Sequence, residues 1–410
     1  MHPFIDTIIA FKFREAGRPV KTKRRSLRVD GHAVPVFINE FWTSRQRQAH
    51  SLHEVSYRAC FKPQLPRFFI ERLTKKGERV YDPFSGRGTT VIEAALCGRA
   101  VAANDVNPLS AILSRSRLSV PSIEQIEERL KKIPMRIGLR SDIPLSMFYH
   151  RETLSELLSL KKYLLRRAKN GTDDDVDRWI RMVATNRLTG HSKGFFSVYT
   201  LPPNQAASPE AQRRINAIRT QRPPYRDVKA IILRKSRQLL KDVTDERKRL
   251  HRAARSGKFI TGDARSTPAL KSGSIALTVT SPPFLDIVQY SKDNWLRCWF
   301  NGIDAEKIEK GITMSRTTEE WNGVMSDVFR ELFRVTKREG WVAFEVGEVR
   351  NGTVRLEEHV VRCGTAAGFT CEGIMVHQQR FTKTANIWGV RNNTAGTNSH
   401  RIVLFRKSVL

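Results

Sequence analysis

Two hydrophobic periods alternate along the chain. Between residues 79 and 113 the pattern predicts a strand ending at Val80-Tyr81, a glycine-containing loop, a helix over 89–97, a short strand over 100–104, a turn and a further helix. Gly98 stands where the first of these helices is expected to stop. Strands that alternate with helices favour a parallel sheet with right-handed crossovers.

The same alternation returns after Gly257. Strands are expected over 258–264, 275–284, 341–349, 369–378 and 400–407, with helices over about 318–337 and 356–367. Upstream, residues 63–77 have helical spacing, and Leu65, Phe68, Phe69 and Leu73 share one face.

Residues 121–256 differ because helical patterns dominate there. They are clearest at 122–133, 153–168 and 228–250, and an irregular segment rich in Gly, Pro, Ser and aromatic residues covers 189–212. We therefore expect an α/β fold interrupted by a mainly helical insertion. Its expected parts are an N-terminal arm (1–48), one half of the α/β domain (49–120), the insertion (121–256) and the second half (257–410).

The net charge of the chain indicates what kind of partner it binds. The 410 residues include 72 Lys+Arg and 41 Asp+Glu, a formal net charge of +31. Residues 201–260 hold 16 Lys/Arg and 5 Asp/Glu, and residues 12–28 hold eight Lys/Arg and one Glu. Such an excess favours polyanionic partners, nucleic acid first and an anionic membrane surface second. The basic cluster at 12–28 fits either a solvated arm or a nucleic-acid contact.

Other classes are disfavoured. No apolar run approaches the roughly 18 residues of a spanning helix, and the N-terminus lacks the pattern of a secretory signal. The five cysteines are scattered without a CxxC pair, so neither a zinc ribbon nor a disulfide framework is indicated. We expect an intracellular protein without a metal site.

A glycine turn offers the first candidate chemistry. Asp82-Pro83-Phe84-Ser85-Gly86-Arg87-Gly88-Thr89-Thr90 stands between the first strand and its helix. Glycines there permit close approach of a ligand to the backbone, but the third glycine of a dinucleotide fingerprint and the GK[ST] of a P-loop are both missing. Asp105, 19 residues beyond Gly86, ends the next strand, where a carboxylate can accept both hydroxyls of a ribose. An ordinary tight turn followed by a helix-capping Asp stays open as the alternative.

A second candidate lies at Thr280-Ser281-Pro282-Pro283-Phe284. Two consecutive prolines must end the apolar strand before them. The resulting stiff turn presents a Ser hydroxyl, carbonyl oxygens and an aromatic face at the carboxyl edge of the sheet, where α/β folds bind ligands. A proline-terminated strand with a core Phe is the alternative.

Together these segments resemble the amino-type DNA methyltransferases, which use S-adenosylmethionine to methylate an exocyclic base nitrogen. DPFSGRGTT is similar to their cofactor motif, NDVNP to the segment with the ribose-binding acid, TSPPF to their catalytic motif, and residues 57–73 to the segment that closes the methionine pocket. The order matches the subgroup whose target-recognition region lies between the cofactor and catalytic motifs. The resemblance implies a Rossmann-like class I methyltransferase sheet interrupted by a basic, mainly helical insertion.

The resemblance also implies roles for single residues. Asp82 would lie near the methionine amino group, Asp105 would hold the ribose hydroxyls, and Asp263 would reach the adenine amino group. Lys62 and Pro63 would cover the methionine end. The implied S-adenosylmethionine site is Lys62, Pro63, Asp82, Pro83, Phe84, Gly86, Gly88, Thr89, Thr90, Asp105, Val106, Asn107, Asp263 and Ala264.

The implied catalytic residues are Ser281, Pro282, Pro283 and Phe284. An exocyclic amine is a poor nucleophile, and acceptors such as Ser281 Oγ and the Pro282 carbonyl would take its N–H bonds during the attack. Phe284 would stack on a base rotated out of the duplex. In this family Ser before the two prolines usually accompanies the N4 amine of cytosine, and Asp or Asn the N6 amine of adenine. Tyr290 and Asn294 fit either a substrate contact or a packed helix. Attack at C5 of cytosine is disfavoured because no Cys follows a Pro.

The expected substrate is double-stranded DNA in a bacterial or archaeal cytoplasm, near the nucleoid, with a cognate restriction endonuclease as a possible partner. Residues 194–196 and 202–204 are candidates for a base-reading loop. Two other functions stay open: an RNA base methyltransferase, and a non-catalytic nucleic-acid-binding protein on a methyltransferase scaffold. Candidate phosphate contacts are Arg213, Arg214, Arg219, Arg222, Arg226, Arg234, Lys235 and Arg237.

Overall fold

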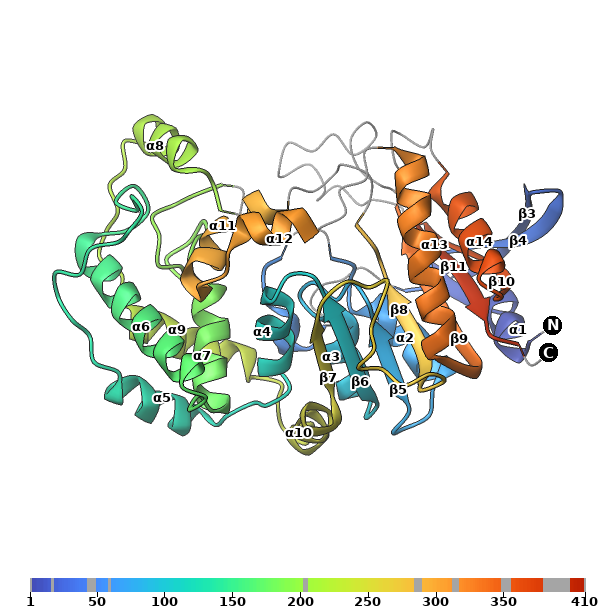
Figure 1. Cartoon of the computed structure of the whole chain (residues 1–410), viewed down its shortest axis with the longest axis horizontal. Helices are drawn as coiled ribbons and strands as arrows, with labels where there is room; N and C mark the ends of the chain where they lie inside the picture. The colour runs from blue at the N-terminus through green and yellow to red at the C-terminus, as the bar shows by residue number, and fades with distance from the viewer. Residues whose placement is uncertain are drawn as a thin grey trace.

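The computed structural model describes residues 2–15, 18–42, 49–57, 60–201, 206–283, 290–311, 317–347, 355–378 and 399–408. A helical lobe lies at one end of the main sheet, and the strands and helices near both termini lie at the other end (Figure 1). Phe284, Pro202–Asn204 and the side chain of Tyr290 lie outside the described part of the chain, so the roles predicted for them have no structural counterpart.

Within the described residues, nine strands form the main sheet in the order β3-β4-β10-β11-β9-β8-β5-β6-β7. The parallel part consists of β7 (Lys258–Thr261), β6 (Ala100–Asp105), β5 (Arg79–Asp82), β8 (Ile275–Thr280) and β9 (Thr336–Val346). β11 (Ser399–Arg406) runs antiparallel to β9 and to β10 (Thr370–Gln378). All six residues of β8 are buried, as expected for a central strand covered on both faces.

The strand order reverses between β7 and β8. The chain passes from β5 to β6 and β7 in one direction and then returns to β8 on the other side of β5. The crevice outside the carboxyl ends of β5 and β8 is therefore a topological switch point, where open α/β sheets bind ligands. The expected Rossmann-like α/β fold is confirmed.

Each face of the sheet has its own core. Val80 and Val101 pack with the helices α2 (Gln64–Leu73), α3 (Thr89–Leu96) and α10 (Arg247–Ser256). Their neighbours Tyr81 and Ala102 point to the opposite face, which α13 (Thr318–Val335) and α14 (Leu356–Ala366) cover. This alternation follows the two-residue period of a strand.

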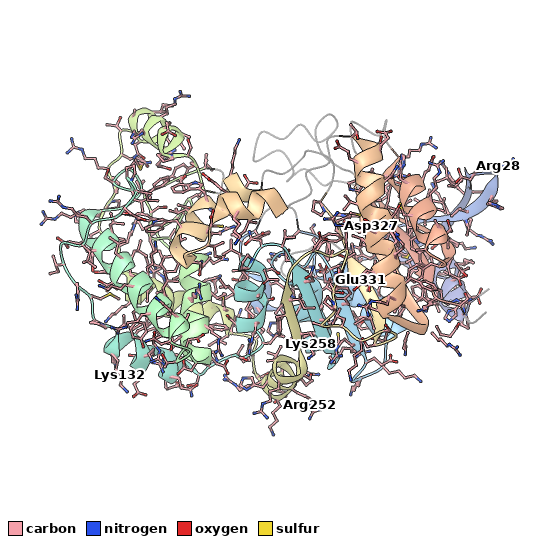
Figure 2. The ribbon with its side chains drawn as sticks, viewed as in Figure 1. Arg28, Lys132, Arg252, Lys258, Asp327 and Glu331 are labelled. Carbon is pink, nitrogen blue, oxygen red and sulfur yellow. The ribbon has the colours of Figure 1, made fainter. Side chains whose placement is uncertain are left out.

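The helical lobe does not coincide with residues 121–256. It includes α5 (Ile123–Lys132), α6 (Arg151–Lys169), α7 (Asp175–Thr185), α8 (Pro209–Ile218) and α9 (Val228–Leu239), and also α11 (Tyr290–Asn301) and α12 (Ala305–Gly311), from beyond β8. Arg181 and Thr185 of α7 both hydrogen-bond to Asn301 of α11. α10, by contrast, packs on α3 and β6. Figure 2 shows Arg252 of α10 and the nearby Lys258 at the edge of the sheet far from α11.

The first 48 residues are more than a basic arm. Phe4, Ile5 and Ile8 of α1 (Pro3–Ile9) are buried in the main core. β1 (Lys12–Glu15) and β2 (Arg18–Lys21) form a small hairpin, and β3 (Lys23–Val29) and β4 (His32–Asn39) extend the main sheet beyond β10. The expectation of an arm was incomplete because the charges of β3 hide its strand pattern.

Candidate active site

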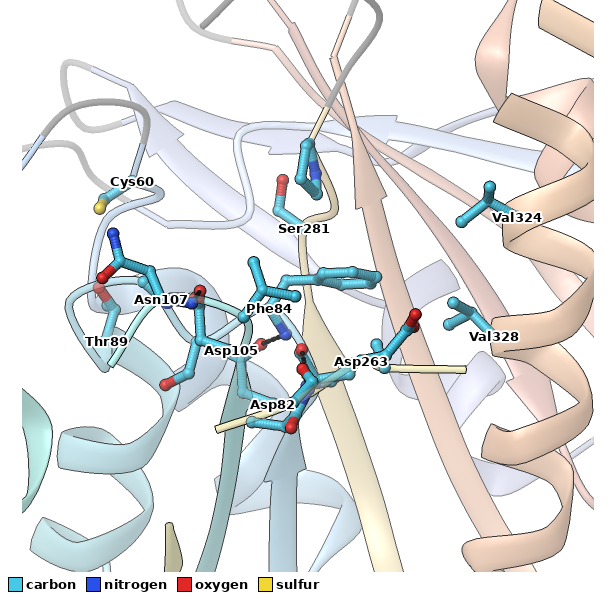
Figure 3. A pocket seen from close by; sticks show the side chains of 18 of the residues that line it. Cys60, Asp82, Phe84, Thr89, Asp105, Asn107, Asp263, Ser281, Val324 and Val328 are labelled. Atoms are coloured by element: carbon cyan, nitrogen blue, oxygen red, sulfur yellow. Dashed lines mark hydrogen bonds between the residues drawn. The ribbon is translucent and has the colours of Figure 1, made fainter. Parts of the chain in front are cut away.

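A pocket lies at the switch point (Figure 3). The space within it, open solvent included, is about 1060 Å³. Its walls include twelve residues that the sequence singled out: Asp82, Pro83, Phe84, Gly86, Thr89, Asp105, Val106, Asn107, Asp263, Ala264, Ser281 and Pro283. These residues come from two segments that the insertion separates. The fold therefore brings the glycine turn (82–90) and the turn at Ser281–Pro283, which we call the proline turn, into one site.

Asp82 lies at the floor of the pocket, at the end of β5. Its Oδ1 accepts hydrogen bonds from Thr280 Oγ1 at 2.6 Å and from the Phe84 backbone N–H at 3.2 Å. Burial raises the pKa of Asp82 to about 7, against the lowering effect of these hydrogen bonds. The carboxyl group is therefore poised to become a full anion when a cationic group lies beside it.

Asp105 ends the adjacent strand β6. Its two oxygens accept the backbone N–H groups of Gly86 at 2.8 Å and Asn107 at 2.9 Å. Burial raises its pKa to about 6, although both hydrogen bonds favour the anion. A carboxylate has about four acceptor positions, so lone pairs remain for hydroxyl groups of a ligand.

The two glycines of the turn differ in purpose. Gly86 lines the pocket with a φ of +50°. Gly88 has a φ of +79° and does not line the pocket; a Cβ there would lie 2.5 Å from Ser114 Cβ in α4 (Leu109–Ser116). Gly88 is thus required by helix packing, and the geometry gives no support to its predicted approach to a cofactor.

The proline turn is anchored from three directions. Thr90 Oγ1 donates to the Val279 carbonyl at 3.0 Å, Thr280 reaches Asp82, and Trp321 Nε1 donates to the Pro283 carbonyl at 3.1 Å. Ser281 lies half-buried in the pocket wall, whereas Pro282 is buried and does not line the pocket. Thr90 therefore supports the turn from α3, outside the pocket wall.

The remaining predicted cofactor residues are Asp263, Lys62 and Pro63. The Asp263 carboxylate is paired with Arg265, whose Nε and Nη2 lie 2.8 and 2.5 Å away, and this pairing lowers its pKa. Lys62 and Pro63 are outside the pocket lining; Pro63 is buried at the start of α2, and partial burial lowers the pKa of Lys62.

Several lining residues were missed by the sequence. Tyr57, Cys60 and Phe61 belong to the segment 57–73 that the resemblance assigns to the methionine pocket, although only Lys62 and Pro63 were predicted there as site residues. The other wall comes from one helix, α13, through Trp321, Val324, Met325 and Val328. The amphipathic pattern of α13 predicts a buried face, but no local signal shows that part of this face borders a pocket.

The predicted phosphate contacts are dispersed. Lys235 is only 6% exposed and binds Glu54 Oε2 at 3.2 Å and Gln238 Oε1 at 2.9 Å, so its assignment as a surface contact was wrong. Arg226 is half-buried, and Arg237 lies 3.9 Å from Glu127 of α5. α5 and α8 lie at opposite ends of the lobe in Figure 1. The candidates that remain exposed near α8 are Arg213, Arg214, Arg219 and Arg222, and Arg234 is exposed on α9.

Comparison with known proteins finds similar sequences for the N-terminal part of the chain, which supplies one side of this site. Residues 12–131 match the N6/N4 methyltransferase family, described as DNA methylase. The type II methyltransferase M.MjaII of Methanocaldococcus jannaschii is 28% identical over 86 residues, and M.MvaI of Kocuria varians is 35% identical over 84 residues. These alignments cover 21% and 20% of this chain but only 16% and 17% of the two relatives. Over residues 12–131, which include the glycine turn and Asp105 but not Ser281–Pro283, the chain is similar to this family.

Similar solved structures have low overall correspondence. A SAM-dependent methyltransferase of Methanosarcina mazei is 10% identical with a TM-score of 0.34, covering 83% of this chain and 98% of its own. Geranyl diphosphate C-methyltransferase of Streptomyces coelicolor is 8% identical with a TM-score of 0.34, covering 84% and 78%. Neither likeness adds to the fold assignment, which rests on the strand order.

The pocket fits S-adenosylmethionine, the cofactor of this family. Within the described chain, Ser85 Oγ and Asn104 Oδ1 are buried at the pocket without a hydrogen-bond partner, and buried polar atoms usually have one. Asp82 and Asp105 supply negative charge, and α13 supplies an apolar wall. The described residues contain no His, Cys, Asp and Glu cluster suited to a metal ion. No described helix is both long enough and apolar enough to span a membrane.

Proposed function

We propose that this protein transfers a methyl group from S-adenosylmethionine to the exocyclic N4 amine of cytosine in double-stranded DNA. One observation carries the proposal: Ser281 and Pro283 line the same pocket as Asp82 and Asp105. A cofactor held by the two carboxylates is thereby adjacent to a turn rich in hydrogen-bond acceptors. The bound cofactor supplies an electrophilic methyl group on a sulfonium.

Each residue has a defined task in this proposal. Asp105 accepts the ribose hydroxyls while the Gly86 and Asn107 N–H groups fix its orientation. Asp82 would hold the cationic methionine end, and the apolar residues of α13 would border the adenine ring. Ser281 Oγ would accept an N–H bond of the target amine as the amine attacks the methyl group. The role predicted for the Pro282 carbonyl has no support, because Pro282 does not line the pocket. Placement of the two reactants provides much of the rate.

The choice of N4-cytosine rests on the Ser before the two prolines, and N6-adenine is the second candidate. Mass spectrometry of the nucleosides in DNA from cells that express the protein distinguishes the two methylated products. Detection of N4-methylcytosine supports the proposal, and detection of N6-methyladenine would instead identify adenine as the target base. The absence of both refutes DNA amine methylation. Long-read sequencing of the same DNA gives the recognition site. We also propose action in the bacterial or archaeal cytoplasm; a cognate restriction endonuclease encoded nearby would complete a modification pair.

Two substitutions separate chemistry from cofactor binding. Ser281→Ala should abolish methylation but leave the S-adenosylmethionine dissociation constant within about twofold, because Ser281 serves the target amine. Asp105→Ala should weaken cofactor binding by roughly 10- to 100-fold, since a bidentate acceptor is lost. Ser274→Ala, at a half-exposed serine before β8, is the matched control. Normal methylation by the Ser281 variant would contradict its assignment.

A further inference from the structure

The basic residues of 201–260 lie in two places, the helical lobe and the amino ends of the strands. The arginines near α8 belong to the helical lobe, but six Lys/Arg and only one Glu lie within residues 246–258, on and beside α10. Arg79, the first residue of β5, donates to the Ser256 carbonyl at 3.3 Å. Gly98, just before β6, lies near Arg249. α10 therefore covers the amino ends of the strands, whereas the pocket lies at their carboxyl ends.

One face of α10 is a cationic stripe, formed by Lys248, Arg252 and Arg255. Their spacing of four and three residues places them on the same side of the helix, and all three are exposed. Leu250 and Ala253, on the opposite side, are buried. Figure 2 shows Arg252 directed away from the protein at this edge.

Other cations extend the stripe. Lys258 follows α10, and Lys75 and Lys76 lie in the turn before β5; all three are exposed. Lys76 Cγ and Arg249 Cδ each lie 3.9 Å from the position that a Cβ on Gly98 would take, so the turn and the helix are neighbours. We call Lys75, Lys76, Lys248, Arg252, Arg255 and Lys258 the α10 patch.

The acids nearest the α10 patch form their ion pairs with cations outside it, although the charge of Lys75 helps to lower the pKa of Glu78. Glu246 pairs with Arg249, and Glu78 pairs with Lys337. None of the six patch cations forms a side-chain ion pair within the described parts of the chain. Like charges four residues apart destabilise a helix, so an uncompensated stripe favours an external polyanion.

A second stripe provides a reference. Lys162, Arg166 and Lys169 of α6 have the same spacing and are also exposed. Acidic residues gather beyond the end of this helix, where Asp173, Asp174 and Asp175 precede or begin α7. Asp174 pairs with Arg129, and Asp173 and Asp175 pair with Arg178, so α6 has an exposed cationic stripe comparable in charge to that of α10.

We propose that the α10 patch binds the phosphate backbone of a second DNA duplex while the pocket holds the first. The inference rests on the proposed function, which supplies duplex DNA as the polyanion that this protein meets. The six residues of β6 separate the two edges by roughly 16–20 Å, and the edges face in opposite directions. A straight duplex that lies over the pocket does not reach the α10 patch, so occupation of both surfaces joins two segments.

A capture assay on the full chain tests this second surface. A biotinylated 200-base-pair duplex is fixed on beads, protein is added and unbound protein is washed away, and a fluorescent duplex of the same length is offered at several salt concentrations. The triple variant Lys248→Glu, Arg252→Glu, Arg255→Glu should capture at least about tenfold less fluorescent DNA and lower the salt slope of capture by roughly 2–3. Its methylation of a single short duplex should equal that of the wild type.

The matched control reverses Lys162, Arg166 and Lys169 to Glu, the same change in charge at the same spacing. Retained capture by this control supports the α10 patch. The proposal is overturned if the wild-type protein captures no second duplex, if the α10 variant captures as much as the wild type, or if the α6 control loses capture equally. Loss of methylation by the wild type would instead refute the proposed function, since capture is measured without turnover.

Discussion

Thr280 Oγ1 donates a 2.6 Å hydrogen bond to Asp82 Oδ1, although 198 positions separate the two residues. The bond joins the carboxyl ends of β5 and β8 across the switch point. Asp82 begins the glycine turn, and Thr280 directly precedes Ser281. The relative position of the cofactor-binding and catalytic segments therefore depends on a carboxyl group that burial holds near its titration point.

Stability without cofactor should fall as pH rises from about 4 to about 7. The pKa of Asp82 is about 7 in the folded protein against 3.8 for an aspartate side chain in water, so the native state binds more protons than the unfolded state over this interval. The loss is complete above pH 7 and amounts to at most about 4 kcal/mol. Urea unfolding at pH 5, 6 and 7.5 measures it.

Asp82→Asn is the variant for this experiment, because the amide keeps the Oδ1 acceptor for Thr280 but does not titrate. Its stability should vary less with pH than that of the wild type, with the remaining slope coming partly from Asp105, whose pKa is about 6. Identical pH profiles for the two proteins would show that Asp82 is already ionised in the folded state.

Trp321→Phe should lower turnover more than it lowers cofactor affinity. Phenylalanine keeps an aromatic wall beside the pocket but deletes the indole N–H that holds the Pro283 carbonyl. Neither proline of the turn has a backbone N–H to donate, so the turn has few other hydrogen bonds to hold it in place. We expect kcat to fall by roughly tenfold, the equivalent of one hydrogen bond, with the cofactor dissociation constant changed by less than about threefold. Rapid-quench methylation and calorimetry give the two values.

Trp295→Phe is the corresponding control, because Trp295 Nε1 donates to the Ala207 carbonyl in the helical lobe, outside the pocket lining. Equal losses of kcat in the two variants would attribute the effect to general destabilisation and not to the proline turn.

The sheet was largely predictable because its signals are local. The helix expected over 89–97 is α3 at Thr89–Leu96, and the strand expected over 100–104 is β6 at Ala100–Asp105. Glycine and proline mark the ends of these elements, and short-range sterics decide where they fall. β3 was missed because five of its seven residues are exposed, so no alternation of apolar and polar residues is visible.

The two walls of the pocket were unequally predictable. Asp82 and Asp105 follow strands in recognisable motifs, and their convergence follows from the parallel sheet. Val324 and Val328 line the pocket only because α13 packs across β8 and β9, which is a tertiary property. Lys235 shows the opposite failure: a basic residue in a basic segment is buried because its position on α9 faces the core.

Cys60 should report ligand binding by its reactivity. It lines the pocket and is not disulfide-bonded, and Cys371 on β10 is similarly half-exposed but distant from the pocket. Burial raises the pKa of both thiols, so alkylation is best followed at about pH 9. S-adenosylhomocysteine at saturating concentration should slow modification of Cys60 several-fold and leave Cys371 unchanged, as peptide mass spectrometry would show. Equal protection of both cysteines would indicate a global effect.

Lys235 and Arg214 should differ in their effect on DNA binding. Arg214 is exposed on α8, and Arg214→Ala should lower the slope of log affinity against log salt by about 0.9, the value for one phosphate contact. Lys235→Met should leave this slope unchanged, because the ammonium group is buried against Glu54 and Gln238. It should instead alter the unfolding midpoint, since removal of the ammonium leaves Glu54 without this partner. Fluorescence anisotropy between 50 and 200 mM salt measures the slopes, and a reduced slope for Lys235→Met would restore it as a phosphate contact.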